Sequence, residues 1–175
     1  ESLSTSVASA GAAVTGLNAL VTATADYTVK GSFGTLTATV DAGADARDVA
    51  SAFNIVSGTT GVIASAVTRG RLSFNAAATY TFTLQGKSTS ASTVTATITS
   101  TSDVTSIKDA INAVSGSTGI TAALTTDKSG INIVQEEGYD VIVGDISGGT
   151  AFLQSMDRNE TLDGNQRTLT SGGND

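Results

Sequence analysis

Two stretches of the chain alternate apolar and polar residues with a period of two. The apolar positions are Leu36, Ala38 and Val40 in the first stretch and Tyr80, Phe82 and Leu84 in the second. Threonines fill the positions between them. Because successive side chains of a strand point to opposite faces, each stretch predicts a half-buried β-strand with threonine on the wet face. The polar segment 85–92 is then expected to form a hairpin loop.

After each of these regions the apolar period changes to that of a helix. The stripes are Val49, Ala52, Phe53 and Val56 in the first and Ile107, Ala110, Ile111 and Val114 in the second. Each helix has about three turns and needs packing on its own hairpin to be stable. Asp45 and Asp103 are predicted N-caps, and Gly58 and Gly116 are predicted left-handed C-terminal residues.

These two helical stripes belong to a longer internal repeat. Residues 45–62 recur as residues 103–120, with Asn54 matching Asn112. The similarity extends back to 37–40 and 95–98, and Tyr27 matches Tyr80 if the second copy carries a few extra residues in its hairpin. Self-similarity of this kind indicates a repeated structural unit.

The remaining segments predict further strands and one helix. Residues 121–124 and 131–135 read as a hairpin around 127–130, and 141–143 form a short apolar run. Another hairpin is expected across Asp163 and Gly164, between Leu162 and Leu169. Weakly periodic apolar residues predict a helix within residues 1–22.

Together these elements predict an α+β fold of two repeated β-hairpin plus short helix units followed by a β-rich terminal segment. The expected divisions are a connecting segment at 1–22, a first unit at 23–75, a second unit at 76–144 and a β-rich return segment at 145–175.

Composition narrows the chemistry of this fold. The chain has no Cys and no His, which excludes thiol chemistry and the usual proton-transfer side chain. A formal net charge of -7 without clustered Lys or Arg argues against a nucleic-acid partner, and no apolar run reaches the roughly 18 residues of a membrane span. We therefore expect no enzyme, cofactor or metal site, although a serine–lysine pair stays open.

One acidic stretch is a candidate for chemistry. Glu136, Glu137, Asp140 and Asp145 could serve as paired carboxylates of a glycosidase or as calcium ligands. Because glycines are interspersed among them, we favour a solvated loop.

The repeated pattern resembles the flagellin hook IN motif. The residues that carry this resemblance are the Asp at the helix start, the Ala-Ile-Asn or Ala-Phe-Asn triplet, the Val-Ser-Gly segment with its following Thr-Gly, and the later Gly-Ile-Asn-Ile strand at 130–133. The second copy, 103–134, fits closely. The first copy departs at Phe53 and at 69–71, where a strand turn lies in the motif.

The resemblance implies a structural, non-enzymatic domain of a bacterial flagellin: variable, surface-exposed, extracellular, antigenic and part of the motility filament. Its partners would be other flagellin subunits, bound through terminal regions that this chain does not show, with lateral contacts between outer domains and a monomeric fragment. Exposed hydroxyls in two loops would be candidate O-glycosylation sites: Ser88, Thr89, Ser90, Ser92, Ser100, Thr101 and Ser102.

Two alternatives stay open. The filament cap and other hook-associated proteins carry the same motif, and a cell-surface adhesin or carbohydrate-binding module would also suit a hydroxyl-rich surface.

Overall fold

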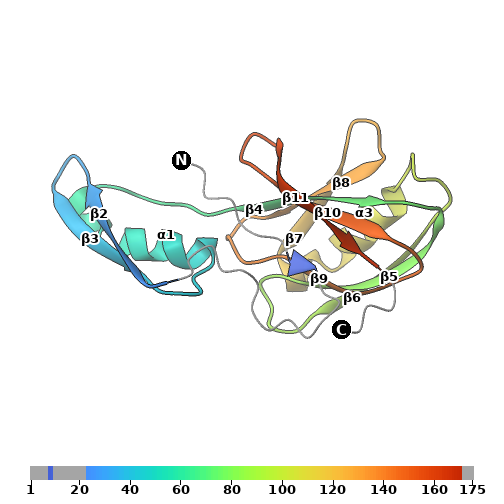
Figure 1. Ribbon diagram of the computed structural model, residues 1–175, viewed down its shortest axis with the longest axis horizontal. Coiled ribbons are helices and arrows are strands. Elements are labelled where there is room, and N and C mark those ends of the chain that lie inside the picture. The colour runs from blue at the N-terminus through green and yellow to red at the C-terminus, as the bar shows by residue number, and fades with distance from the viewer. Residues whose placement is uncertain (1–7, 10–22, 171–175) are drawn as a thin grey trace.

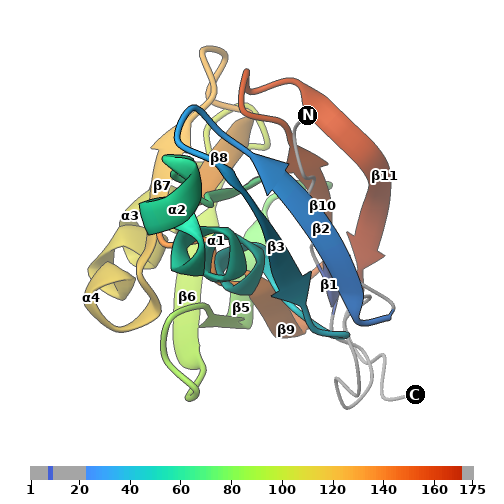
Figure 2. The ribbon, with the colours of Figure 1, turned by 90° about the vertical axis from the view of Figure 1, so that its left-hand side faces the viewer.

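The computed structural model describes residues 8–9 and 23–170, which form a small lobe and a larger body joined by an extended connection (Figure 1). The small lobe contains the hairpin β2 (Ala25–Lys30) and β3 (Thr35–Val40), with α1 (Ala46–Ile55) and α2 (Ser57–Thr60) beside it. Figure 2 views this lobe from its free end, with α1 and α2 lying beside the two strands. The chain then runs into the body as β4 (Thr68–Phe74).

Two sheets and two short helices build the body around one hydrophobic core. The elements are β1 (Ala8–Ser9), β5 (Ala78–Gln85), β6 (Ser92–Ile98), α3 (Thr105–Ala113), α4 (Ser115–Thr118), β7 (Ile120–Leu124), β8 (Gly130–Gln135), β9 (Ile142–Ser147), β10 (Ala151–Met156) and β11 (Leu162–Leu169). One sheet has the order β1-β9-β5-β6 and the other the order β11-β10-β4-β8-β7. Side chains from both sheets and from α3 meet in a single core. The described chain is mostly strand with four short helices, which is compatible with the predicted α+β class.

The period-two prediction is confirmed along β5. Tyr80, Phe82 and Leu84 are buried in the core. On the opposite face the threonines pair across the hairpin, with hydroxyl distances of 2.7 Å between Thr79 and Thr97 and 3.0 Å between Thr81 and Thr95. Such cross-strand pairs suit β-branched side chains whose hydroxyls face water.

The small lobe has a thinner core. Val29, Ala38 and Val56 form one buried cluster, and Val40, Ala44 and Val49 form another, both completed by the partly buried Phe53. Leu36, expected on the apolar face of its strand, is 44% exposed. The reason is that this hairpin carries only a helix on its inner face, whereas the β5–β6 hairpin shares its core with a second sheet.

The first unit does not close its sheet as the second does. In the second unit the chain continues from α4 into the predicted hairpin β7–β8, which the structure confirms. In the first unit the segment at 69–71, placed at a turn in the motif, instead lies inside β4, between β8 and β10 of the body. The division into units 23–75 and 76–144 therefore remains a proposal about the sequence repeat. In the structure β4 of the first unit hydrogen-bonds to β8 of the second.

The two predicted N-caps have different outcomes. Asp45 is the N-cap of α1 and accepts a 2.7 Å hydrogen bond from the Asp48 N–H, as predicted. Asp103 is not the N-cap of α3, because the helix starts after Val104 and Asp103 accepts bonds from the backbone and hydroxyl of Thr105. The prediction for Asp103 is wrong by one residue.

The predicted left-handed glycines are also wrong. Gly58 and Gly116 lie inside the short helices α2 and α4. The left-handed residues are Gly61 and Gly119, with φ of 72° and 68°, which end these extra helical turns. After each apolar stripe the chain thus makes one additional helical turn before it changes direction.

The predicted hairpin across Asp163 and Gly164 is wrong as well. Both residues lie within β11, which pairs antiparallel with β10 from Ala151 opposite Leu169 to Met156 opposite Leu162. The turn is earlier, where the Asp157 side chain accepts hydrogen bonds from the backbone N–H groups of Asn159 and Thr161. An Asp that bonds the backbone two residues ahead is itself a turn former.

The prediction of a helix within 1–22 falls mostly outside the described residues. At Ala8–Ser9 it is wrong, because these residues form β1 and pair in parallel with β9. None of the helices in the described part of the chain is long and apolar enough to cross a membrane.

Candidate functional site

The repeated asparagine clamps the helix of each unit to the segment that follows it. The Asn54 amide donates to the Ala64 carbonyl at 2.9 Å and accepts from the Ala64 N–H at 2.8 Å. Asn112 makes the same pair of bonds to Ala122, with distances of 2.9 Å and 2.8 Å. In each unit the asparagine side chain thus makes the backbone hydrogen bonds that a neighbouring strand would make with Ala64 or Ala122. The motif asparagine therefore has a structural role.

The repeated threonine and serine close the extra helical turn. Thr60 donates to the Val56 carbonyl at 2.9 Å and accepts from the Val62 N–H. Thr118 repeats both contacts with Val114 and Ile120. Ser57 and Ser115 bond the carbonyls of the asparagines three residues before them. The polar side chains shared by the two copies are therefore directed to their own backbone.

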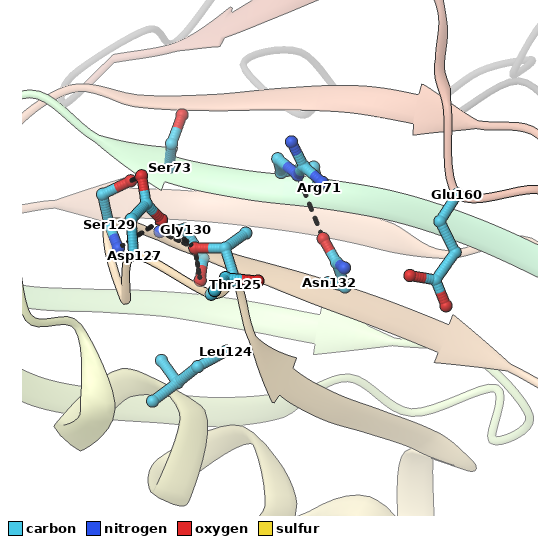
Figure 3. A pocket seen from close by; sticks show the side chains of 10 residues that line it. Arg71, Ser73, Leu124, Thr125, Asp127, Ser129, Gly130, Asn132 and Glu160 are labelled. Atoms are coloured by element: carbon cyan, nitrogen blue, oxygen red, sulfur yellow. Dashed lines mark hydrogen bonds between the residues drawn. The ribbon is translucent and has the colours of Figure 1, made fainter.

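A groove lined mainly by polar residues lies on the five-stranded sheet. It has a volume of about 540 Å³ and is lined by β4, β8, the β7–β8 loop and Glu160 from the β10–β11 turn. Figure 3 shows Arg71 and Asn132 side by side on its floor, joined by a 3.0 Å hydrogen bond from Nε to Oδ1. Asp127, Ser129 and Thr125 form one wall. This arrangement offers hydrogen-bonding groups of both kinds to a polar molecule.

The wall of the groove is a self-contained turn. The Asp127 carboxylate accepts from the Thr125 hydroxyl at 2.6 Å and from the hydroxyl and N–H of Ser129 at 2.8 Å and 3.2 Å. These hydrogen bonds stabilise the charged form and lower the pKa of Asp127 to about 2. Because the carboxylate is already bonded to its own loop, it is a structural group and a weak candidate for proton transfer.

This turn predicts a measurable acid dependence. A carboxyl whose pKa is lowered on folding contributes stability above its unfolded pKa of about 3.9, and that contribution disappears as the pH falls toward about 2. Ser129→Ala removes one hydroxyl donor and should raise the Asp127 pKa toward its ordinary value. Side-chain carboxyl NMR titration measures this shift, with Thr126→Ala as the control from the same loop. An unchanged Asp127 pKa in Ser129→Ala would contradict the assigned cause.

The acidic stretch does not converge on one point. Glu137 accepts a 2.7 Å hydrogen bond from Lys87, which raises the pKa of that lysine. Burial and the nearby charges of Asp45 and Asp48 raise the pKa of Asp140. Asp145 lies exposed in β9. Across residues 8–9 and 23–170, no three acidic side chains are grouped so as to hold a metal ion.

The candidate O-glycosylation residues lie in the β5–β6 loop, at the first residue of β6 and in the segment between β6 and α3. Ser92 and Ser117 share a hydroxyl contact, Ser100 and Ser102 share another, and the Ser88 hydroxyl accepts from the Ser90 N–H. Within the described structure the hydroxyls of Thr89, Ser90 and Thr101 have no such partner, and all three residues are exposed. These three are the strongest of the proposed acceptors.

Asn54 and Asn112 occupy matching positions of the sequence repeat, but no role was predicted for them. The groove was not predicted at all. A single Asn kept at the same step after both apolar stripes was the available signal for the first. No comparable signal exists for the groove, whose Arg71, Asn132 and Glu160 come from distant parts of the chain and meet only through strand pairing.

Comparison with protein families identifies the repeat. The family model described as flagellin hook IN motif matches twice, at residues 27–78 and 81–136, which is more than half of the chain. The two matches coincide with the two clamped units. A comparison with curated proteins finds no match.

Proposed function

This chain belongs to the flagellin hook IN motif family, and from that premise we propose that it is a surface-exposed variable domain of a flagellin. Members of this family have a structural role in the extracellular flagellar filament, where flagellin subunits polymerise. The finer proposal is that this region decorates the filament exterior, where it forms an antigenic surface of the motility organelle.

One observation carries the proposal: two family matches fall on units whose shared Asn, Ser and Thr side chains at the end of the helix bond to their own backbone. Ligand pockets depend on a few polar groups that are placed to contact the ligand. Here the repeated Asn, Thr and Ser build a scaffold. The outer faces of its strands carry threonine hydroxyls, which suit a surface that stays in water.

The partners follow from the same proposal. Other flagellin subunits would be contacted through terminal regions beyond this chain, while Thr89, Ser90 and Thr101 would accept O-linked sugars. The domain itself would contribute bulk and lateral contacts.

Immunogold electron microscopy of the producing bacterium tests the proposal. Antibodies raised against the 175-residue chain should label the filament along its whole length. Label confined to the filament tip would favour the filament cap, and label at the hook–filament junction would favour another hook-associated protein. Label spread over the cell body would favour an adhesin. Any of these three patterns would overturn the flagellin proposal, and antibodies preadsorbed with the chain provide the control.

A further inference from the structure

Residues 62–66, between the two parts of the molecule, form a connecting segment whose backbone is clamped on one side by Asn54. Along residues 62–66 the exposure alternates: Ile63 and Ser65 are exposed, while the residues on either side of them are half-buried. Ile63 is 85% exposed, which is unusual for a large aliphatic side chain. The alternation is that of a β-strand, yet the segment pairs with no strand of the described structure.

The second unit shows what normally occupies this edge. The counterpart of Ala64 is Ala122 in β7, because both are clamped by the motif asparagine. The opposite edge of β7 is filled by β8, with Thr121 opposite Val134 and Ala123 opposite Asn132. In the first unit the residues that would supply such a strand have entered the body as β4, so the edge next to 62–66 is left unfilled.

The direction of the free backbone groups follows from the clamp. Both the N–H and the C=O of Ala64 face Asn54. Since backbone groups alternate in direction along a strand, those of Ile63 and Ser65 face the other way. In residues 8–9 and 23–170 no hydrogen-bond partner is found for the N–H or C=O of either residue.

This edge has none of the features that discourage strand addition. Residues 58–67 contain no charged residue and no proline, and natural edge strands are normally protected by charge, proline or a bulge. The exposed apolar side chains Phe33 and Ile55 belong to the same lobe. An extended antiparallel strand therefore finds free backbone partners and apolar surface together.

We propose that residues 62–66 pair antiparallel with the same segment of a second copy of this chain, about a two-fold axis at Ala64. In this register the two Ala64 residues form a non-hydrogen-bonded pair, because their backbone groups are already held by Asn54. Ile63 then exchanges both backbone hydrogen bonds with Ser65 of the partner subunit, and the symmetric pair does the same.

A second copy is the occupant that fits because its segment is free in the same register and equally uncharged. The strands of its body that resemble β8 are already paired within their own sheet. The biological setting rests on the proposed function, since polymerised flagellin subunits hold neighbouring copies close together. The pairing itself is a property of the chain and is tested without a filament.

Cysteine capture tests the register. In Ala64→Cys the two introduced thiols would face each other across the axis, within the Cα separation of about 4.4–6.8 Å that a disulfide spans. Under mild oxidation we expect at least about tenfold more covalent dimer than in Thr59→Cys, an exposed site of the same lobe outside the edge. Ala122→Cys, whose edge is filled by β8, is the matched control and should give no excess dimer. Equal cross-linking in Ala64→Cys and Thr59→Cys would overturn the proposal.

A second measurement uses the unmodified chain. The amides of Ile63 and Ser65 should become more protected from hydrogen exchange as the concentration rises, in at least 0.15 M salt, which screens the repulsion between copies of net charge -7. Ile63→Lys places two like charges on one face of the pair and should abolish this dependence, while Thr89→Lys in the body should not. Concentration-independent protection would contradict self-pairing.

A peptide with the β8 sequence Gly-Ile-Asn-Ile-Val-Gln provides the last arm. If it protects the two amides while the chain itself stays monomeric, the edge accepts a strand of another protein and the second copy is the wrong occupant. Because none of these readouts involves a flagellum, their failure leaves the immunogold result unaffected, and the reverse also holds.

Discussion

Asn112→Ala should lower the free energy of unfolding by about 4 kcal/mol, whereas Asn54→Ala should lower it by only about 1 kcal/mol. The two asparagines make the same pair of hydrogen bonds. The difference lies in what the bonds protect. Ala122 is 9% exposed and would be left with an unpaired N–H and C=O away from water, which costs about 1–3 kcal/mol for each group. Ala64 is half-buried in the connecting segment before β4, where water can replace the amide.

Urea unfolding followed by circular dichroism measures both variants. Asn112→Asp is the informative third variant, because it keeps the acceptor for the Ala122 N–H but loses the donor to the Ala122 carbonyl. It should be destabilised nearly as much as Asn112→Ala, since the remaining carboxylate faces a carbonyl oxygen. Equal losses in Asn54→Ala and Asn112→Ala would show that burial does not determine the cost, and would remove the basis for treating the first unit as the more open one.

Local patterns predicted the elements of the fold well. The threonine-alternating strands, both helical stripes, the β7–β8 hairpin and the loop after Gln85 were all expected from residue spacing and are present. The prediction of a hairpin at Asp163 and Gly164 is wrong because it relied on a dipeptide that favours turns. The actual turn forms earlier in the chain. Asp157 organises the real turn through its side chain, and Glu160 adopts a φ of 62° there.

What the sequence could not predict is long-range pairing. Nothing near Gly70 indicates that it will lie between Ile133 and Ser155, so the repeat suggested a turn where a strand crosses into the body. The groove of Figure 3 depends on this crossing, because Arg71 reaches Asn132 only when β4 pairs with β8. The same crossing leaves the edge at Ile63 unfilled. Two copies of one motif therefore differ in their available surfaces, although the hydrogen bonds of the motif asparagine, serine and threonine at the helix end are the same.

Gly148→Ala should be at least as damaging as the loss of the Asn112 clamp, with an expected cost of about 4 kcal/mol or more. Gly148 follows β9 with a φ of 94°, and a Cβ there would lie 1.9 Å from the Thr79 carbonyl oxygen and 2.8 Å from its carbon. The obstacle is backbone of β5, which is paired on both sides and cannot move without disturbing β6 and β9.

Gly43→Ala separates the two contributions to that cost. Gly43 has a similar φ of 86° but nothing within 4 Å of an added Cβ, so its substitution should cost only the roughly 1 kcal/mol of placing an L-residue in the left-handed region. The difference between the two variants in urea or thermal unfolding then measures the close approach of β9 to β5 alone. If Gly148→Ala unfolds at the same denaturant concentration as Gly43→Ala, the two strands do not approach as closely as the structure shows. In that case the turn after β9 would have to pack against β5 differently from the arrangement in this structure.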